Sequence, residues 1–200
     1  LERNDLLELL RDGLQAAPRI HVVASAEAHI TLDVALRYLG LGTRALVPVD
    51  SDEQGRMRAD RLRDTLSKLQ GPVIVCAQAG NVNTGAFDPL REIAAASHAH
   101  GAWLHVDGAF GLWARASASD ALRAHADGIE LADSWATDAH KWLNVPYDCG
   151  VAIVRNAGDH RAAMTSTAAY LVQTGGTERD SVDWVPEFSR RARGIPVHAA

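Results

Sequence analysis

Val73-Ile74-Val75-Cys76-Ala77 is an unbroken apolar run, preceded by Gly71-Pro72 and followed by a Gly- and Asn-rich loop over 78–89. A short run of this kind, rich in β-branched residues, is typical of a strand that is buried on both faces. Such strands occur mainly in parallel sheets whose two faces are covered by helices. We therefore expect an α/β fold built around this strand.

The segments on either side of this strand alternate between helix and strand patterns. Upstream, Leu62, Leu66 and Leu69 form the stripe of an amphipathic helix that ends at Gly71. Downstream, a helix is expected over 90–100 and a strand over 103–106. Further helices are expected over 4–16 and 25–38, and further strands over 20–24, 45–49, 134–137 and 151–154, the last of which could return antiparallel. This order predicts a mainly parallel sheet with helices on both faces.

Length and composition fit a soluble enzyme without identifying one. The 200 residues, 47% of them hydrophobic, can bury a sizeable core. A net charge of −5 without a long basic block argues against nucleic acid or an anionic membrane as a partner. No apolar run could span a bilayer and no leader is visible, so we expect a cytoplasmic location. The first residue is Leu1, and the chain stops soon after the expected start of a helix, so we expect a fragment of a longer protein.

Two cysteines and several polar strand ends bear on function. Cys76 and Cys149 lie in apolar runs, which favours reduced thiols over a disulfide. Asp107, the loop from Gln78 and the segment 25–29 each follow an expected strand. In open α/β sheets, ligands bind outside the carboxyl ends of the strands. We therefore expect these three segments to converge on one crevice.

Lys141 lies between His140 and Trp142, downstream of an expected strand end. A lysine and a strand-end carboxylate together suit pyridoxal phosphate, whose aldehyde bonds an amine and whose ring nitrogen is kept protonated by a carboxylate. Most lysines are simply solvated on a surface. This chain has only two lysines, and the flanking His and Trp favour the functional interpretation of Lys141.

Other candidate sites are weaker. His98, His100 and His105 suggest zinc, but they bridge a helix end and a strand, where a histidine is favoured by the helix dipole. We therefore expect no metal site. Gly40-Leu41-Gly42 lacks the third glycine of a dinucleotide fingerprint and follows a helix instead of a strand. The arginine cluster at 190–193 is interpreted as a solvated helix start.

Several separated motifs resemble those of the group II pyridoxal phosphate-dependent amino acid decarboxylases, which include aromatic L-amino acid decarboxylase. They occur in the family's order: Ala28-His29, Gly80 with Phe87-Asp88, His105-Val106-Asp107-Gly108-Ala109, Asp133-Ser134, His140-Lys141-Trp142-Leu143, Tyr147-Asp148-Cys149 and Tyr170-Leu171. The resemblance implies the fold type I architecture of aspartate aminotransferase. It also implies a cofactor-binding large domain over 1–160, incomplete at its N-terminus. Residues 161–200 would then form the catalytic-loop region and the start of the connection to a missing C-terminal small domain.

The resemblance assigns four residues to the cofactor. Lys141 matches the Schiff-base lysine, and Asp107 matches the aspartate that pairs with the pyridine nitrogen. Ala109 matches the residue under the ring, and His29 matches the imidazole that stacks over the other face. Without the resemblance, Asp107 would be interpreted as a helix cap and His29 as an ordinary polar residue near a helix start.

Four further residues complete the expected site. His140 matches a neighbour that helps to hold the phosphate or the Schiff base, and Tyr170 matches the tyrosine of a mobile catalytic loop, proposed to protonate the carbanion. Asn81 stands where relatives often carry a hydroxyl residue, which leaves its role open. Asp138 stands where many relatives carry Asn, so its side chain would repel a phosphate unless water or a backbone donor intervenes.

The resemblance therefore implies an amino acid decarboxylase that acts through Lys141, releases carbon dioxide and an amine, and is a homodimer at full length. The phenol of Tyr170 favours plain decarboxylation, because aldehyde-forming relatives typically carry Phe there. Two alternatives remain open. One is a truncated, non-catalytic homologue that binds the cofactor, and the other is a fold type I aminotransferase or aldehyde synthase.

Overall fold

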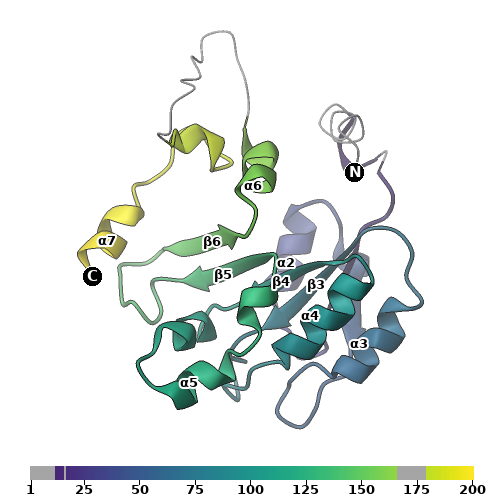
Figure 1. The fold of residues 1–200 in the computed structure, drawn as a ribbon. Helices are drawn as coiled ribbons and strands as arrows, with labels where there is room; N and C mark the ends of the chain where they lie inside the picture. Colours follow the sequence, from purple (N-terminus) through teal and green to yellow (C-terminus); the bar gives the residue numbers. More distant parts are fainter. Residues whose placement is uncertain (1–11, 16, 166–178) are drawn as a thin grey trace.

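The computed structural model describes residues 12–15, 17–165 and 179–200 (Figure 1). Its strands are β1 (His21–Ser25), β2 (Leu46–Val49), β3 (Val73–Gln78), β4 (Trp103–Asp107), β5 (Ser134–Asp138) and β6 (Gly150–Val154). Its α-helices are α2 (Thr31–Tyr38), α3 (Ala59–Leu66), α4 (Leu90–Ala99), α5 (Asp120–His125), α6 (Ala157–Met164) and α7 (Gly194–Ala199). Short 3-10 helices are η1 (Gly13–Gln15), η2 (Thr43–Ala45), η3 (Gly111–Ala116), η4 (Ile129–Leu131) and η5 (Ser181–Asp183).

The strands form one six-stranded sheet in the order β2-β1-β3-β4-β5-β6. The first five strands are parallel to one another, and β6 returns antiparallel to β5. The prediction of a mainly parallel sheet is confirmed. In register, Gln78 lies opposite Asp107 and Asp107 lies opposite Ala136. The carboxyl ends of β3, β4 and β5 are therefore level with one another.

Helices α3 and α4 pack side by side on one face of the sheet (Figure 1). Leu62 and Leu66 of α3 and Ile93 of α4 meet Val75 and Leu104 of the sheet in one buried core. Each of these side chains contributes about 1.5–3 kcal/mol through burial. Helix α2 lies on the opposite face, and this placement confirms the expectation of helices on both faces.

A second, smaller cluster joins the turn after β5 to the end of the chain. Ala139, Val145 and Cys149 are buried there, and Val197 of α7 packs against them. The guanidinium of Arg193 donates to the Asp148 carboxylate at 3.2 Å. The arginine cluster does lie at the start of a helix, as the sequence suggested, and Arg193 in addition ties α7 to the β5–β6 turn.

The expected helix over 25–38 begins later than predicted. Ser25 is the last residue of β1, and its Oγ accepts the N–H of Glu27 at 3.1 Å. The carbonyl of Ser25 accepts the N–H of Ala28 at 2.9 Å, so Ser25 closes a tight turn before the helix begins at Thr31. Most of the expected helix over 4–16 lies outside the described residues. None of the helices in the described ranges is long and apolar enough to cross a membrane.

Candidate active site

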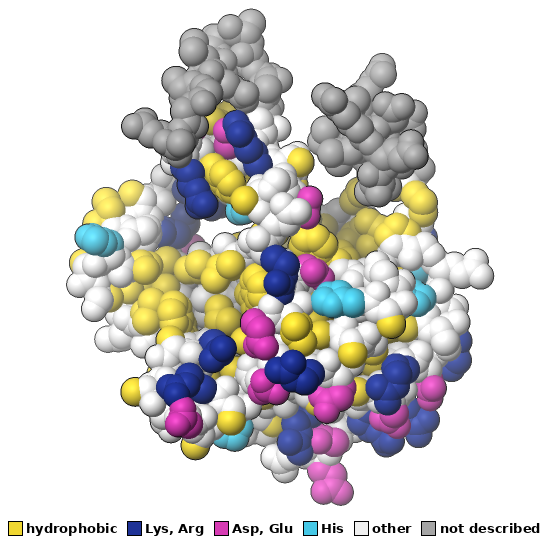
Figure 2. All heavy atoms as spheres, in the orientation of Figure 1, with side chains coloured by type: hydrophobic (Ala, Val, Ile, Leu, Met, Phe, Trp, Pro, Cys, Tyr) yellow, Lys and Arg dark blue, Asp and Glu magenta, His cyan; other side chains and the backbone are white. Residues whose placement is uncertain are grey.

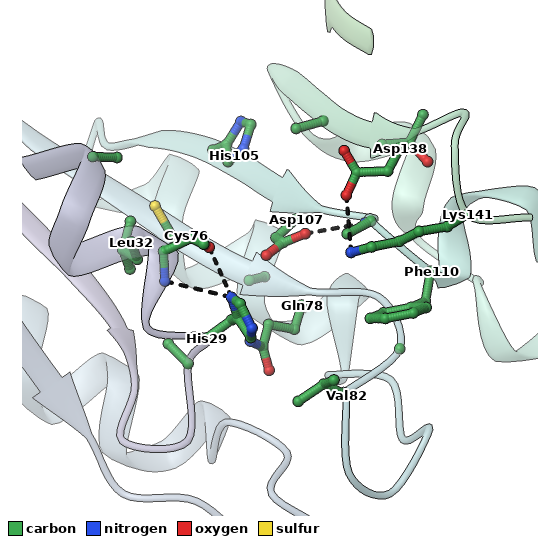
Figure 3. A pocket seen from close by; sticks show the side chains of 18 of the residues that line it. His29, Leu32, Cys76, Gln78, Val82, His105, Asp107, Phe110, Asp138 and Lys141 are labelled. Carbon is green, nitrogen blue, oxygen red and sulfur yellow. Dashed lines mark hydrogen bonds and ion pairs between the residues drawn. The ribbon is translucent and has the colours of Figure 1, made fainter. Parts of the chain in front are cut away.

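A cavity of about 560 Å³ opens at the carboxyl ends of β3, β4 and β5, on the side of the sheet that carries α2 (Figure 3). Most of the residues that the sequence singled out line it. These are His29, Asp107, Ala109, Asp138, His140 and Lys141. The three segments expected to meet at the strand ends therefore do meet in one cavity.

Lys141 reaches into the cavity from the turn that follows β5. Its Nζ lies 2.9 Å from Asp138 Oδ2 and 4.1 Å from the centroid of the Phe110 ring. The turn is closed by two backbone hydrogen bonds, from Lys141 N–H to the Asp138 carbonyl and from Asn144 N–H to the Lys141 carbonyl. A carboxylate and an aromatic face both stabilise an ammonium. The amine is thus held at the cavity wall, with 30% of the lysine side chain exposed.

Asp107 ends β4 and points into the cavity. Its Oδ1 accepts the N–H of Ala109 at 3.0 Å, which fixes the carboxylate in a turn two residues long. Figure 3 shows its other oxygen facing the middle of the cavity. Asp107 therefore accepts a hydrogen bond within a local turn, where the sequence alone suggested a helix cap. This hydrogen bond uses only one carboxylate oxygen, and the second oxygen remains available to a ligand.

The chain after β4 is packed directly on the loop after β3. The N–H of Ala79 donates to the Asp107 carbonyl at 2.8 Å, and the N–H of Gly111 donates to the Ala79 carbonyl at 2.9 Å. A Cβ on Gly111 would lie 2.3 Å from that carbonyl oxygen. Only glycine fits at this close approach, which therefore holds Asp107 in place.

His29 lies across the cavity from Lys141 (Figure 3). Its Nδ1 is 2.8 Å from Thr31 Oγ1 and accepts the N–H of Thr31 at 3.4 Å. Because a backbone N–H can only donate, Nδ1 is the acceptor in this contact. The ring is thus anchored at the start of α2.

His140 fixes the turn that carries Lys141. Its Nδ1 accepts the N–H of Cys149 at 2.9 Å, and its ring centroid lies 4.0 Å from that of Tyr147. The imidazole therefore bridges the two ends of the β5–β6 connection and lines the cavity beside the lysine. This contact spans nine residues and could not be deduced from the sequence.

Two of the expected site residues are not among the described residues that line the cavity. Asn81 is 6% exposed and lies behind Gln78, with its Nδ2 at 3.4 Å from Gln78 Oε1. Tyr170 lies outside the described residues, so its role stays a prediction. The division of the chain at residue 160 also stays a prediction.

Two lining residues that the sequence analysis did not single out for the cofactor site form the cavity floor. Cys76 and His105 are paired across β3 and β4, on the same face as Gln78 and Asp107. Burial raises the pKa of the Cys76 thiol to about 12, and the charge of Asp107 adds to the effect. Burial lowers the pKa of His105, which Asp107 partly offsets. The floor is therefore neutral, and the period of two along each strand was the signal that could have found it.

Asp88 anchors the loop between β3 and α4. It is 5% exposed, and its two oxygens accept the N–H groups of Met57 and Gln78, each at 2.7 Å. Burial raises the pKa of this carboxyl to about 6, against the opposing effect of the two hydrogen bonds. Asp88 is thus a structural residue that fixes the end of β3 at the cavity.

The histidines considered for zinc make separate contacts. His98 Nε2 lies 3.2 Å from Asp133 Oδ2, and His105 Nδ1 lies 2.8 Å from Ser134 Oγ. Across residues 12–15, 17–165 and 179–200, no group of three or more His, Cys, Asp or Glu residues is placed to hold a metal ion.

Comparison with known proteins gives a consistent result. Residues 11–199 match the family described as the pyridoxal-dependent decarboxylase conserved domain. The acidic amino acid decarboxylase GADL1 of Mus musculus is 35% identical over 83% of this chain and 31% of its own length. The L-2,4-diaminobutyrate decarboxylase of Rhizobium meliloti is 36% identical over 96% of this chain and 39% of its own length. The chain thus spans well under half the length of these relatives.

Solved structures show the same similarity. A crystal structure of mouse CSAD in apo form matches with a TM-score of 0.85 at 30% identity, over 98% of this chain and 41% of that one. A crystal structure of Oryza sativa TDC with PLP and tryptamine matches with a TM-score of 0.83 at 26% identity, over 96% and 41% of the two chains. The expected fold type I architecture is therefore confirmed.

Proposed function

This chain belongs to the pyridoxal-dependent decarboxylase family, and we therefore propose that the protein containing it is a pyridoxal phosphate-dependent amino acid decarboxylase that bonds its cofactor through Lys141. One observation carries the proposal. The amine of Lys141, the carboxylate of Asp107 and the imidazole of His29 meet in one cavity at the carboxyl ends of the strands.

The residues of the cavity fit pyridoxal phosphate. Lys141 supplies the amine for its aldehyde, and the second oxygen of Asp107 supplies an anion for its ring nitrogen. His29 on one side and the small Ala109 on the other leave room for a flat ring. The volume of about 560 Å³ is in the range of small-molecule sites. When bound, the cofactor supplies the electron sink for the bond that breaks.

The protein's own contribution is orientation and electrostatics. The carboxylate of Asp107 is fixed by its turn, so it needs no reorganisation to keep a ring nitrogen protonated. Leu32, Val82 and Phe110 give the cavity apolar walls, which strengthen the interactions of the charged groups. The carboxylate of Asp138 forms an ion pair with Lys141 and therefore balances the charge of its ammonium group.

The substrate, assembly and location are also proposals. We propose an α-amino acid as the substrate, because the relatives named above act on amino acids. We propose a homodimer at full length, because Trp142 and Tyr147 beside the cavity are 71% and 77% exposed, as aromatic residues of an interface would be before assembly. A cytoplasmic location is supported by the free thiols of Cys76 and Cys149.

The test uses the full-length protein and its two lysines in this region. We expect release of carbon dioxide and an amine from at least one member of a panel of amino acids. Lys141→Ala should abolish this release, and Lys68→Ala, which changes an exposed lysine, should leave it unchanged. Activity that survives Lys141→Ala would contradict the proposal, as would aldehyde or keto acid as the main product. Sedimentation of the same protein tests the dimer.

A further inference from the structure

The side chain of Gln78 carries hydrogen-bond donors that no described residue uses. Gln78 is the last residue of β3, is 7% exposed and lines the cavity. It lies in register with Asp107, and residues in register on parallel strands point to the same face. Figure 3 shows Gln78 in the same cavity as His29 and Asp107, and all three residues line it.

The orientation of this amide follows from its neighbour Asn81. The backbone N–H groups of Asn83 and Thr84 lie 2.9 and 3.3 Å from Asn81 Oδ1. A backbone N–H can only donate, so the Asn81 oxygen must face them. The Nδ2 of Asn81 then points the other way, to Gln78 Oε1 at 3.4 Å. The assignment of both amides is therefore set by backbone donors.

Gln78 consequently presents its Nε2 hydrogens to the cavity. Within the described chain its Oε1 is bonded to Asn81, whereas its Nε2 has no protein acceptor and is not enclosed by protein. The backbone of Gln78 is held by Asp88, through N–H to Oδ2 at 2.7 Å and through its carbonyl to the Asp88 N–H at 3.0 Å. The donor is thus already in place, and a ligand that uses it loses little entropy in ordering it.

We propose that Gln78 is a ligand-binding residue whose amide donates a hydrogen bond to an oxygen of the bound cofactor and substrate, and that Asn81 is the residue that positions it. The inference rests on the proposed function. Asp107 and Asp138 repel an anionic oxygen, so a donor at Gln78 supplies what these carboxylates cannot. Two oxygens have the required chemistry, the ring hydroxyl oxygen of pyridoxal phosphate and the carboxylate of the amino acid.

Three stable probes separate these two oxygens. They are N-phosphopyridoxyl-alanine, N-phosphopyridoxyl-ethylamine, which lacks the carboxylate, and the 3-deoxy form of the alanine adduct, which lacks the ring hydroxyl. Titration calorimetry measures their affinities for the cofactor-free full-length protein. Gln78→Leu should bind the alanine adduct roughly tenfold to a hundredfold more weakly, because a hydrogen bond to a charged group is lost.

Two matched variants sharpen the result. Asn81→Asp keeps both backbone hydrogen bonds but turns an acceptor toward Gln78, whose amide hydrogens are then drawn away from the cavity, so it should weaken binding as Gln78→Leu does. Gln70→Leu makes the same chemical change at an exposed position and should leave all affinities unchanged. Because Asn81→Asp leaves Gln78 itself intact, it tests the idea even where Gln78→Leu fails to fold.

Each outcome either identifies the ligand oxygen that accepts the hydrogen bond from Gln78 or shows that this hydrogen bond does not form. A loss confined to adducts that carry the carboxylate assigns it to the substrate, and a loss that is absent only for the 3-deoxy adduct assigns it to the ring hydroxyl. Equal affinities of the wild type and Gln78→Leu for all three adducts overturn the inference and leave the proposed function standing. A wild-type protein that binds none of the adducts overturns the proposed function itself.

Discussion

The strands that carry Asp107 and Gln78 rest on a large hydrophobic core, whereas the turn that carries Lys141 rests on a small one. Among the described residues, the core that supports β1, β3 and β4 contains 19 buried hydrophobic residues, whereas the cluster under the Lys141 turn contains three. Figure 2 shows the same contrast on the surface, with charged side chains over α3, α4 and α5 and hydrophobic side chains exposed near β5 and β6. Ile153 of β6, for example, is 43% exposed.

The residues that determine the stability of the domain are therefore largely different from those that position the reactive amine. Asp107 and Gln78 extend from strands of the large core, so their positions are fixed as long as the domain is folded. Lys141 and His140 extend from a turn held mainly by hydrogen bonds and by α7. Changes in the large core should therefore act first on stability, and changes around the turn should act first on the reactivity of the amine.

The largest expected effect is on the large core. Leu104→Ala should lower the free energy of unfolding by about 2–5 kcal/mol, because Leu104 is fully buried and its removal leaves a cavity. Val145→Ala in the small cluster should cost only about 1–2 kcal/mol. Thermal and urea unfolding of the full-length protein measures both. Equal losses would show that the two regions are one cooperative core.

The next effect concerns Asp88 and pH. Its pKa is raised in the folded state to about 6 from an ordinary value of 3.8. Folding favours the protonated carboxyl of Asp88. Its contribution to the free energy of unfolding is therefore fully present below pH 3.8 and is lost as the pH rises through about 6. The loss is at most about 3 kcal/mol, since one pKa unit corresponds to about 1.4 kcal/mol. Unfolding of wild type and Asp88→Asn between pH 4 and 7 tests this, and parallel curves would contradict it.

A smaller effect on stability is expected from His140→Phe. The variant keeps a ring but leaves the Cys149 N–H without its acceptor, which should cost about 1 kcal/mol. The rate at which pyridoxal phosphate bonds Lys141 should also fall strongly, because the turn that carries the amine loses the hydrogen bond between His140 and Cys149. Visible absorbance after mixing follows this rate. An unchanged rate with reduced stability would show that this hydrogen bond contributes to folding alone.

The smallest change in stability is expected from Asp138→Asn. The ion pair with Lys141 is partly exposed, so its loss should change stability by less than about 1 kcal/mol. The freed amine should bond pyridoxal faster, and it should bond pyridoxal phosphate faster still, because Asp138 no longer repels the phosphate. Slower bonding of both aldehydes would show instead that Asp138 orients the lysine productively.

The same contrast explains how much the sequence could predict. The strand at 73–77 and the leucine stripe at 62–69 are periodic and buried, so local pattern predicted the sheet and its helices. The rule that ligands bind at strand carboxyl ends then brought Asp107 and His29 together. Their roles toward a cofactor stay predictions.

The remaining details depend on hydrogen bonds that no local pattern contains. Ser25 has the chemistry of a helix cap but closes a tight turn, because it belongs to the end of β1. His140 braces its turn through Cys149, nine residues away. The amide of Gln78 is oriented by Asn81, which is in turn oriented by a loop backbone. Such contacts follow only once the chain is folded.

Lys141 is the residue that we propose to bond pyridoxal phosphate. Borohydride reduction of the full-length holoprotein, followed by peptide mapping, tests it most directly. We expect a single stable pyridoxyl label on the peptide that contains Lys141. A label on Lys68 or on another peptide, or no label on protein that demonstrably holds the cofactor, would contradict it.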